Sequence, residues 1–275
     1  MAQSSNVYSL NIVGYANVAV AGNGAITALT TPFDLDGVNN ADKVLNHAAL
    51  SDVGGNPGLD QFYVQIWNGQ SFDQVHFDQT FTANNTGGAV TNGWDTDGGG
   101  TQQGIPPNLP PGLGYFINNG GPTVSNVFVG NVVEQGTSSI IGTTNTSVSI
   151  TGNGAISFIG SPVPLVGSLS PNGSGYYTLP SGPLHLPVAA LSDVGGNPGL
   201  DQFYVQIWNG QSFDQVHFDQ TFTSNNTGGA VTNGWDTDGG GTQQGVPPVV
   251  IYGQGFMVNN GGPTTVWLQS VTNAP

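Results

Sequence analysis

Two short acidic motifs are the residues of this sequence best suited to hold a metal ion. Asp95-Thr96-Asp97-Gly98 and Asp236-Thr237-Asp238-Gly239 each place two carboxylates two residues apart, before glycines that permit a sharp turn. Such oxygen ligands suit a hard cation such as Ca²⁺, although no glutamate follows at the distance that a complete calcium loop needs. The alternative is that these aspartates are solvated turn residues. The candidate calcium ligands are Asp95, Asp97, Asp236 and Asp238.

Residues that commonly act in catalysis are few and poorly grouped. The four histidines show no metal-ligand spacing, and the sequence contains neither cysteine nor arginine. Two aspartates could in principle flank a glycosidic bond, but nearly any β protein with 15 aspartates offers such a pair. We therefore expect that the protein is not an enzyme.

The charge balance excludes several classes of partner. Sixteen acidic residues oppose a single basic one, Lys43, which leaves a net charge of −15. Nucleic acids and anionic membrane surfaces are bound through Lys and Arg, so neither is an expected partner. No stretch reaches the roughly 18 apolar residues of a membrane-spanning helix, and stability must come from apolar burial and backbone hydrogen bonds.

The sequence is an internal duplication. Residues 48–107 recur at 189–248, and only Ala83→Ser224 and Ile105→Val246 differ. A repeat of this length is a folding unit, so we predict two similar lobes, residues 1–136 and 137–275. Many glycines and prolines between short alternating runs are typical of an all-β fold. We expect each lobe to be a β-sandwich or a β-barrel, with little helix beyond residues 41–50.

One hairpin is predicted with a defined face. Asn68-Gly69 separates two alternating runs, and a two-residue turn there would pair Trp67 with Gln70 and Gln65 with Phe72. One face of the hairpin then carries aromatic and amide side chains, which suit stacking on sugar rings or packing on another protein. The alternative is that the lobe's own loops cover this face. Its candidate residues are Tyr63, Trp67, Phe72 and His76, with the repeat equivalents Tyr204, Trp208, Phe213 and His217.

Short motifs spread along the chain resemble a group of uncharacterised secreted bacterial proteins known from environmental genomes. They include the opening Val7-Tyr8-Ser9-Leu10-Asn11-Ile12-Val13-Gly14-Tyr15, the Trp67-Asn68-Gly69 hairpin and the strand Pro111-Gly112-Leu113-Gly114-Tyr115-Phe116. The resemblance implies a secreted two-lobed β protein without established catalytic residues. The Asp-Thr-Asp-Gly loops and the near absence of Lys and Arg depart from the group.

Two functions remain open at this stage. The first is an extracellular structural subunit that binds copies of itself in a fibre or filament, through β-strand addition and the aromatic faces. An N-terminal strand could complete a neighbour's sheet, or pair within its own lobe. Its candidate residues are Val7, Tyr8, Leu10, Ile12, Val13 and Tyr15. The second function is extracellular carbohydrate binding, with a polysaccharide as partner. The scarcity of trypsin sites favours an extracellular location, and we expect that a secretion signal has been removed.

Overall fold

The protein is nearly all β in the computed structural model, which confirms the predicted fold class. The structure describes residues 13–35, 37–46, 50, 62–77, 93–96, 104–132, 143–163, 166–171, 185–186, 203–218, 235–237 and 246–272. Within these residues, no helix has the length and apolarity needed to cross a membrane.

The first half of the described chain forms two antiparallel sheets. The larger has the strand order β2-β6-β3-β4-β5 and the smaller pairs β1 with β7. A single short helix, α1, lies between β2 and β3. The elements are β1 (Val13–Val20), β2 (Ala25–Thr30), α1 (Ala41–Val44), β3 (Phe62–Trp67), β4 (Phe72–Phe77), β5 (Trp94–Asp95), β6 (Gly114–Asn119) and β7 (Val124–Asn131).

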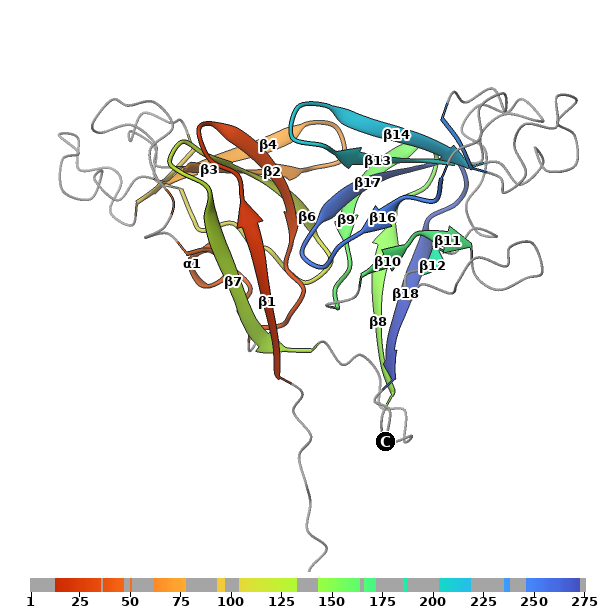
Figure 1. Ribbon diagram of the computed structural model, residues 1–275, viewed down its shortest axis with the longest axis horizontal. Coiled ribbons are helices and arrows are strands. Elements are labelled where there is room, and N and C mark those ends of the chain that lie inside the picture. The colour runs from red at the N-terminus through yellow and green to blue at the C-terminus, as the bar shows by residue number, and fades with distance from the viewer. Residues whose placement is uncertain are drawn as a thin grey trace, which may run out of the picture.

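The second half repeats this topology. Its larger sheet has the order β9-β17-β13-β14-β15, and β8 pairs with β18. Figure 1 shows the halves side by side, with the large sheets above and the two-stranded sheets below. The elements are β8 (Thr143–Ile150), β9 (Ala155–Gly160), β10 (Gly167–Ser168), β11 (Ser170–Pro171), β12 (His185–Leu186), β13 (Phe203–Trp208), β14 (Phe213–Phe218), β15 (Trp235–Asp236), β16 (Val249–Val250), β17 (Gly255–Asn260) and β18 (Thr265–Thr272).

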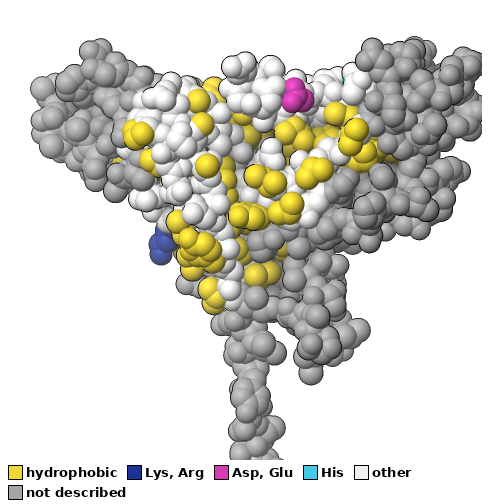
Figure 2. Space-filling model, in the orientation of Figure 1, with side chains coloured by type: hydrophobic (Ala, Val, Ile, Leu, Met, Phe, Trp, Pro, Cys, Tyr) yellow, Lys and Arg dark blue, Asp and Glu magenta, His cyan; other side chains and the backbone are white. Residues whose placement is uncertain are grey.

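The β1–β7 sheet carries apolar side chains on both of its sides. Ala16, Val18 and Val20 are buried, and the residues between them are exposed, as expected for a strand that covers a core on one side. Hydrophobic side chains are nevertheless visible over these strands from outside (Figure 2). We call the outward-pointing residues the β1–β7 outer face, which consists of Val13, Tyr15, Asn17, Ala19, Ser125, Val127, Val129 and Asn131.

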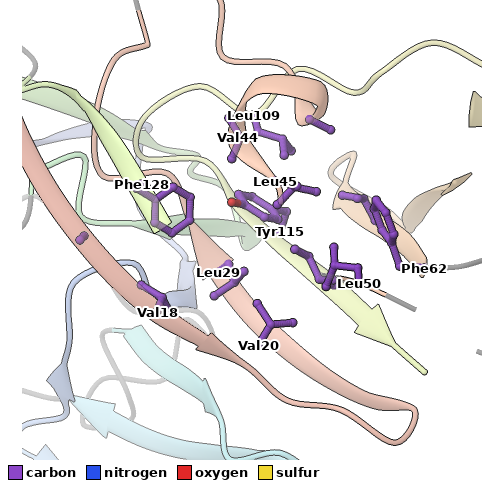
Figure 3. Close-up of a cluster of buried hydrophobic side chains, with 14 of the residues drawn as sticks. Val18, Val20, Leu29, Val44, Leu45, Leu50, Phe62, Leu109, Tyr115 and Phe128 are labelled. Atoms are coloured by element: carbon purple, nitrogen blue, oxygen red, sulfur yellow. The ribbon is translucent and has the colours of Figure 1, made fainter. Parts of the chain in front are cut away.

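The first core lies between the two sheets of the first half, so the half is sandwich-like. β1 and β7 supply one side of it, and the inner face of the large sheet supplies the other, while α1 closes one end. Side chains from all of these elements meet in Figure 3. The labelled residues are Val18, Val20, Leu29, Val44, Leu45, Leu50, Phe62, Leu109, Tyr115 and Phe128.

The predicted register of the hairpin is wrong, because the turn is two residues longer than predicted. Trp67 pairs with Phe72 and Gln65 with Gln74, so the loop has four residues. The cause is the side chain of Asn68, whose Oδ1 accepts hydrogen bonds from the backbone N–H groups of Gln70 and Ser71, each at 2.9 Å. A side chain that bonds the backbone ahead of it favours a wider turn. The shift preserves the face of every strand residue, because side chains alternate with a period of two.

The helix predicted for residues 41–50 ends at Val44. Asn40 caps its start, and Leu45 is already extended at φ −106° and ψ 140°. Asn126 of β7 explains the stop. Its Nδ2 donates to the Val44 carbonyl at 3.0 Å and its Oδ1 accepts from the Asn46 N–H at 2.9 Å. These bonds replace the partners that a further helical turn would supply.

Burial of Tyr115 makes the folded state less stable at alkaline pH. Complete burial raises the pKa of its phenol well above the usual 10.0, and a 3.4 Å contact with Thr31 Oγ1 only partly opposes this. Its neutral form therefore stabilises the folded state, and this stability is lost as the pH rises above about 10. We expect the free energy of unfolding to fall from pH 9 to pH 12, and Tyr115→Phe to flatten that fall. Urea unfolding followed by circular dichroism measures both, and equal slopes would contradict the assignment.

Candidate functional site

The predicted aromatic face lies on the outer side of each large sheet, and the structure divides it into two parts. Trp67, Phe72 and their equivalents Trp208 and Phe213 pack around a third apolar cluster. Tyr63 and His76 lie farther along the same face as a cross-strand pair, with ring centroids 5.6 Å apart. Tyr204 and His217 repeat this pair at 5.7 Å. The second half of the chain therefore lies against the Trp67 end of the face.

The third cluster joins the two halves. Its buried members are Ala28 and Phe116 from the first half, and Phe158 and Met257 from the second. The rings of Phe116 and Phe158 lie 4.7 Å apart at an interplanar angle of 46°, a tilted arrangement that aromatic pairs favour. Because each ring comes from the sheet of a different half, the halves share one continuous apolar contact.

Each tryptophan of the face donates a hydrogen bond across this contact. Trp67 Nε1 lies 2.8 Å from the carbonyl oxygen of Ile156 in β9. Trp208 Nε1 lies 2.7 Å from the carbonyl oxygen of Ile26 in β2. The two bonds are reciprocal, as in the symmetric interface of a homodimer, and they fix the orientation of both indole rings.

The edge strands of the large sheets also meet the opposite half. The Thr30 N–H donates to the Gly253 carbonyl at 2.9 Å, and the Gly160 N–H donates to the Gly112 carbonyl at 3.0 Å. Isolated bridges join Leu29 to Gln254 and Leu113 to Ile159. A glycine-containing turn of each half thus covers the end of the other half's edge strand, and satisfies backbone groups that an open edge would expose.

Two pockets lie at equivalent positions beside this contact. Each is bounded by the small sheet and the edge strand of one half, and by the glycine turn and the tryptophan of the other half. The pocket beside Trp67 has a volume of about 410 Å³, and the pocket beside Trp208 about 400 Å³. We call them the Trp67 pocket and the Trp208 pocket.

The two pockets differ in chemistry. The hydroxyl side chains of Ser147, Ser149, Thr151 and Ser157 line the Trp67 pocket. In the Trp208 pocket the equivalent positions are Asn17, Ala19, Ala21 and Thr27. Tyr252 and Gln254 stand in place of Pro111 and Leu113, and the apolar residues Val166 and Ile251 are added. The duplication therefore produced one hydroxyl-lined and one largely apolar pocket.

The glutamines of the face form a hydrogen-bonded row beside the histidine. Gln65 Nε2 donates to Gln74 Oε1 at 3.0 Å, and Gln74 Nε2 lies 2.8 Å from His76 Nε2. The second half repeats both bonds at 2.9 Å and 2.8 Å. Partial burial raises the pKa of Tyr63 beside this row. The row thus links the amide side chains of the two strands to the imidazole ring of the histidine.

The candidate calcium ligands are only partly described. Asp95 is buried at the end of β5 opposite His76, and Asp236 ends β15 opposite His217. Asp97 and Asp238 lie outside the described residues. Among the residues that the structure does describe, no three or more His, Cys, Asp or Glu side chains form a metal-binding group. Calcium binding stays a prediction.

The predicted strand-addition segment is also divided. Val13 and Tyr15 belong to β1, which pairs with β7 of the same half over its whole length. Both side chains are exposed, by 65% and 66%, and belong to the β1–β7 outer face. Val7, Tyr8, Leu10 and Ile12 lie outside the described residues.

Sequence reasoning missed the residues on the opposite side of the contact. Ala28, Phe116, Phe158 and Met257 belong to strands that are buried on both faces at this point. The available signal was the run Tyr115-Phe116-Ile117, because successive apolar residues indicate a strand covered on both sides.

Comparison of the chain with protein-family models, curated proteins and solved structures finds no match, so the resemblance to secreted bacterial proteins stays an expectation.

The close approach of the two halves can be tested at Gly253. Its φ is +75°, and a Cβ there would lie 2.5 Å from Val18 Cγ2. Gly24 is a matched control, because its φ is +78° and a Cβ there would meet nothing within 4 Å. Both alanine variants carry the left-handed strain of roughly 1–2 kcal/mol, but only Gly253→Ala adds an overlap worth about 1–3 kcal/mol. Urea unfolding should show the larger loss for Gly253→Ala, and equal losses would argue against the packing of this turn on β1.

The calcium prediction is tested by chelation. If Asp95, Asp97, Asp236 and Asp238 take part in ion binding, EDTA should lower the melting temperature and added Ca²⁺ should restore it, because a ligand that binds only the folded state stabilises it. Differential scanning calorimetry measures the shift. Asp97→Asn with Asp238→Asn should abolish the response, and an unchanged melting curve for the wild type would remove calcium from consideration.

Proposed function

We propose that the protein is an extracellular structural subunit that self-associates through the β1–β7 outer face. The observation that carries this proposal is the exposure of Tyr15 and Val13 by about two thirds, next to Val129 at 51% and Val127 at 43%. Contiguous apolar side chains on a protein surface commonly mark a contact with another protein. Figure 2 shows hydrophobic side chains gathered over this part of the molecule.

Charge limits where two copies of the chain can meet. Two molecules that each carry a net charge of −15 repel one another, so a contact between them must be made where acidic side chains are absent. The strands Val13–Val20 and Val124–Asn131 contain no charged residue. Apolar burial there gains free energy without bringing carboxylates together.

The duplication supplies a comparison for the same face. Tyr15 pairs with Val129 across β1 and β7, and the equivalent pair across β8 and β18 is Asn145 with Ser270. The first half thus carries an aromatic and a branched apolar residue where the second half carries polar ones. An asymmetry of this kind favours a head-to-tail contact, in which one half of each copy meets a different surface of the next, and such contacts extend into filaments.

Strand addition is the second component of the proposal. Among the described strands, β1 pairs with β7 alone, and the free edge of a two-stranded sheet accepts a further strand. Trp67, Phe72, Trp208 and Phe213 already contact the opposite half of their own chain. The proposal therefore assigns the contact between copies to β1 and β7 rather than to the aromatic faces.

The test replaces the outer face with residues that the second half carries at the same positions. The variant Val13→Thr, Tyr15→Asn and Val129→Ser removes about 3 kcal/mol or more of apolar contact, since each buried side chain of this kind contributes roughly 1.5–3 kcal/mol. We expect at least a 100-fold weaker self-association. Sedimentation velocity over a range of concentrations, together with negative-stain electron microscopy, measures it.

A matched control changes the second half instead. Val266→Ser introduces the residue found at the equivalent position 125, and Val266 is exposed by 48%, so this variant should assemble like the wild type. A wild type that stays monomeric at high concentration, or a triple variant that assembles normally, would contradict the proposal.

A further inference from the structure

We infer that the Trp67 pocket is a binding site for an uncharged saccharide, and that the Trp208 pocket is not. This inference goes beyond self-association, and it does not depend on it. It differs from the expectation of the sequence, in which both copies of the aromatic face are candidates for glycan binding.

Charge limits the ligand to a neutral molecule. None of the described residues that line the Trp67 pocket is ionisable, and the single Lys in the sequence, Lys43, belongs to α1. A carboxylated or sulfated glycan would meet a chain of net charge −15 without a cation to bind its acidic groups. A cationic ligand would find no carboxylate in the lining. The pocket therefore suits a ligand whose polar groups are hydroxyls.

The lining offers the two kinds of contact that a sugar ring uses. The indole of Trp67 is a flat apolar ring that is partly buried, and its hydrogen bond to the Ile156 carbonyl holds it in place before any ligand arrives. The C–H face of a pyranose is apolar, so it can stack on such a ring. A ring that is already oriented loses little side-chain entropy on binding.

Hydroxyl side chains from β8 and the following turn face the same pocket. Ser149 and Thr151 are exposed, and Ser147 is half-buried. Ser157 is only 7% exposed, and its Oγ accepts the Thr151 N–H at 2.8 Å, which fixes the oxygen and the start of the turn. A pocket of about 410 Å³ with an apolar surface and a few placed polar groups is typical of small-ligand sites.

The Trp208 pocket has the same framework without this chemistry. Ala19 and Ala21 replace Ser149 and Thr151, and Tyr252 replaces Pro111. Three hydroxyl groups are lost, since Asn17 also replaces Ser147, and a tyrosine is added. Asn17, Thr27 and Gln254 remain as polar side chains, but a sugar would meet mostly apolar side chains where it needs hydrogen-bond partners. Leaving polar groups of a ligand unpaired on burial is costly. Of these two pockets, only the Trp67 pocket therefore suits a saccharide.

The experiment uses the full chain with three soluble neutral polysaccharides, a β-glucan, a starch-type α-glucan and a galactomannan, and alginate as an anionic control. Affinity electrophoresis identifies the retained polysaccharide, and isothermal titration with its oligosaccharides measures the affinity. We expect retention by at least one neutral polysaccharide and none by alginate. The variant Ser149→Ala with Thr151→Ala, which copies the Trp208 pocket, should bind at least 10-fold more weakly.

The tryptophans provide a matched pair of controls. Trp67→Ala and Trp208→Ala remove the same side chain and an equivalent hydrogen bond across the same contact, so any general destabilisation should be alike in both. Only Trp67→Ala should abolish retention. Equal effects of the two variants, full retention by the double hydroxyl variant, or no retention of the wild type by any of the neutral polysaccharides would each overturn the inference.

Self-association is measured on the same samples by sedimentation velocity. The two hydroxyl substitutions lie away from the β1–β7 outer face, so assembly should be unchanged where saccharide binding is lost. Conversely, the triple variant of the outer face should keep its saccharide affinity. Each of the two proposals can therefore be contradicted by these measurements without affecting the other.

Discussion

The contact between the two halves is the interaction on which the rest of the structure depends. A chain with one basic residue cannot be held together by ion pairs, and its halves are joined by apolar rings, two indole hydrogen bonds and two backbone bonds at glycine turns. Glycine is required where the backbones approach, since a Cβ on Gly255 would lie 2.6 Å from the Leu29 carbonyl oxygen. The contact thus requires small residues where the backbones meet and is filled by aromatic side chains around them.

Reciprocity at this contact explains why two pockets exist and why they could diverge. The residues that form the contact belong to sheets with the same strand order in both halves. Each of them packs against its counterpart's half, so a change in one half also alters the packing of the other. The small sheets and the turns at the rim are less constrained. Changes there, such as Ala19 against Ser149 or Tyr252 against Pro111, alter a pocket without altering the junction. A shared framework with an altered rim is the condition under which one duplicated site can acquire a new ligand.

Much of the fold could be predicted from the alternation of apolar residues, but its long-range contacts could not. The faces of the hairpin strands followed from period-two patterning, and Phe62 and Val64, which alternate with Tyr63 and Gln65, lie in the core. The predicted hairpin register is wrong at Asn68, and the predicted helix is too long because of Asn126. In each case an asparagine side chain bonds backbone groups to which the local sequence pattern assigns no partner. The aromatic face was identified from sequence. That its Trp67 end meets the other half depends on Phe116 and Phe158, which are far apart in the sequence and belong to different sheets.

The reciprocal cover of the edge strands has a consequence during translation. The turn at Gly253 that bonds Thr30 leaves the ribosome long after β2. At roughly 5–20 residues per second the nascent first half waits on the order of ten seconds or more for its cover. Throughout that interval the apolar surface around Ala28 and Phe116 is exposed to solvent, and neighbouring nascent chains expose the same surface. Biogenesis of this protein therefore has to keep newly made halves from pairing between molecules before each finds its own partner.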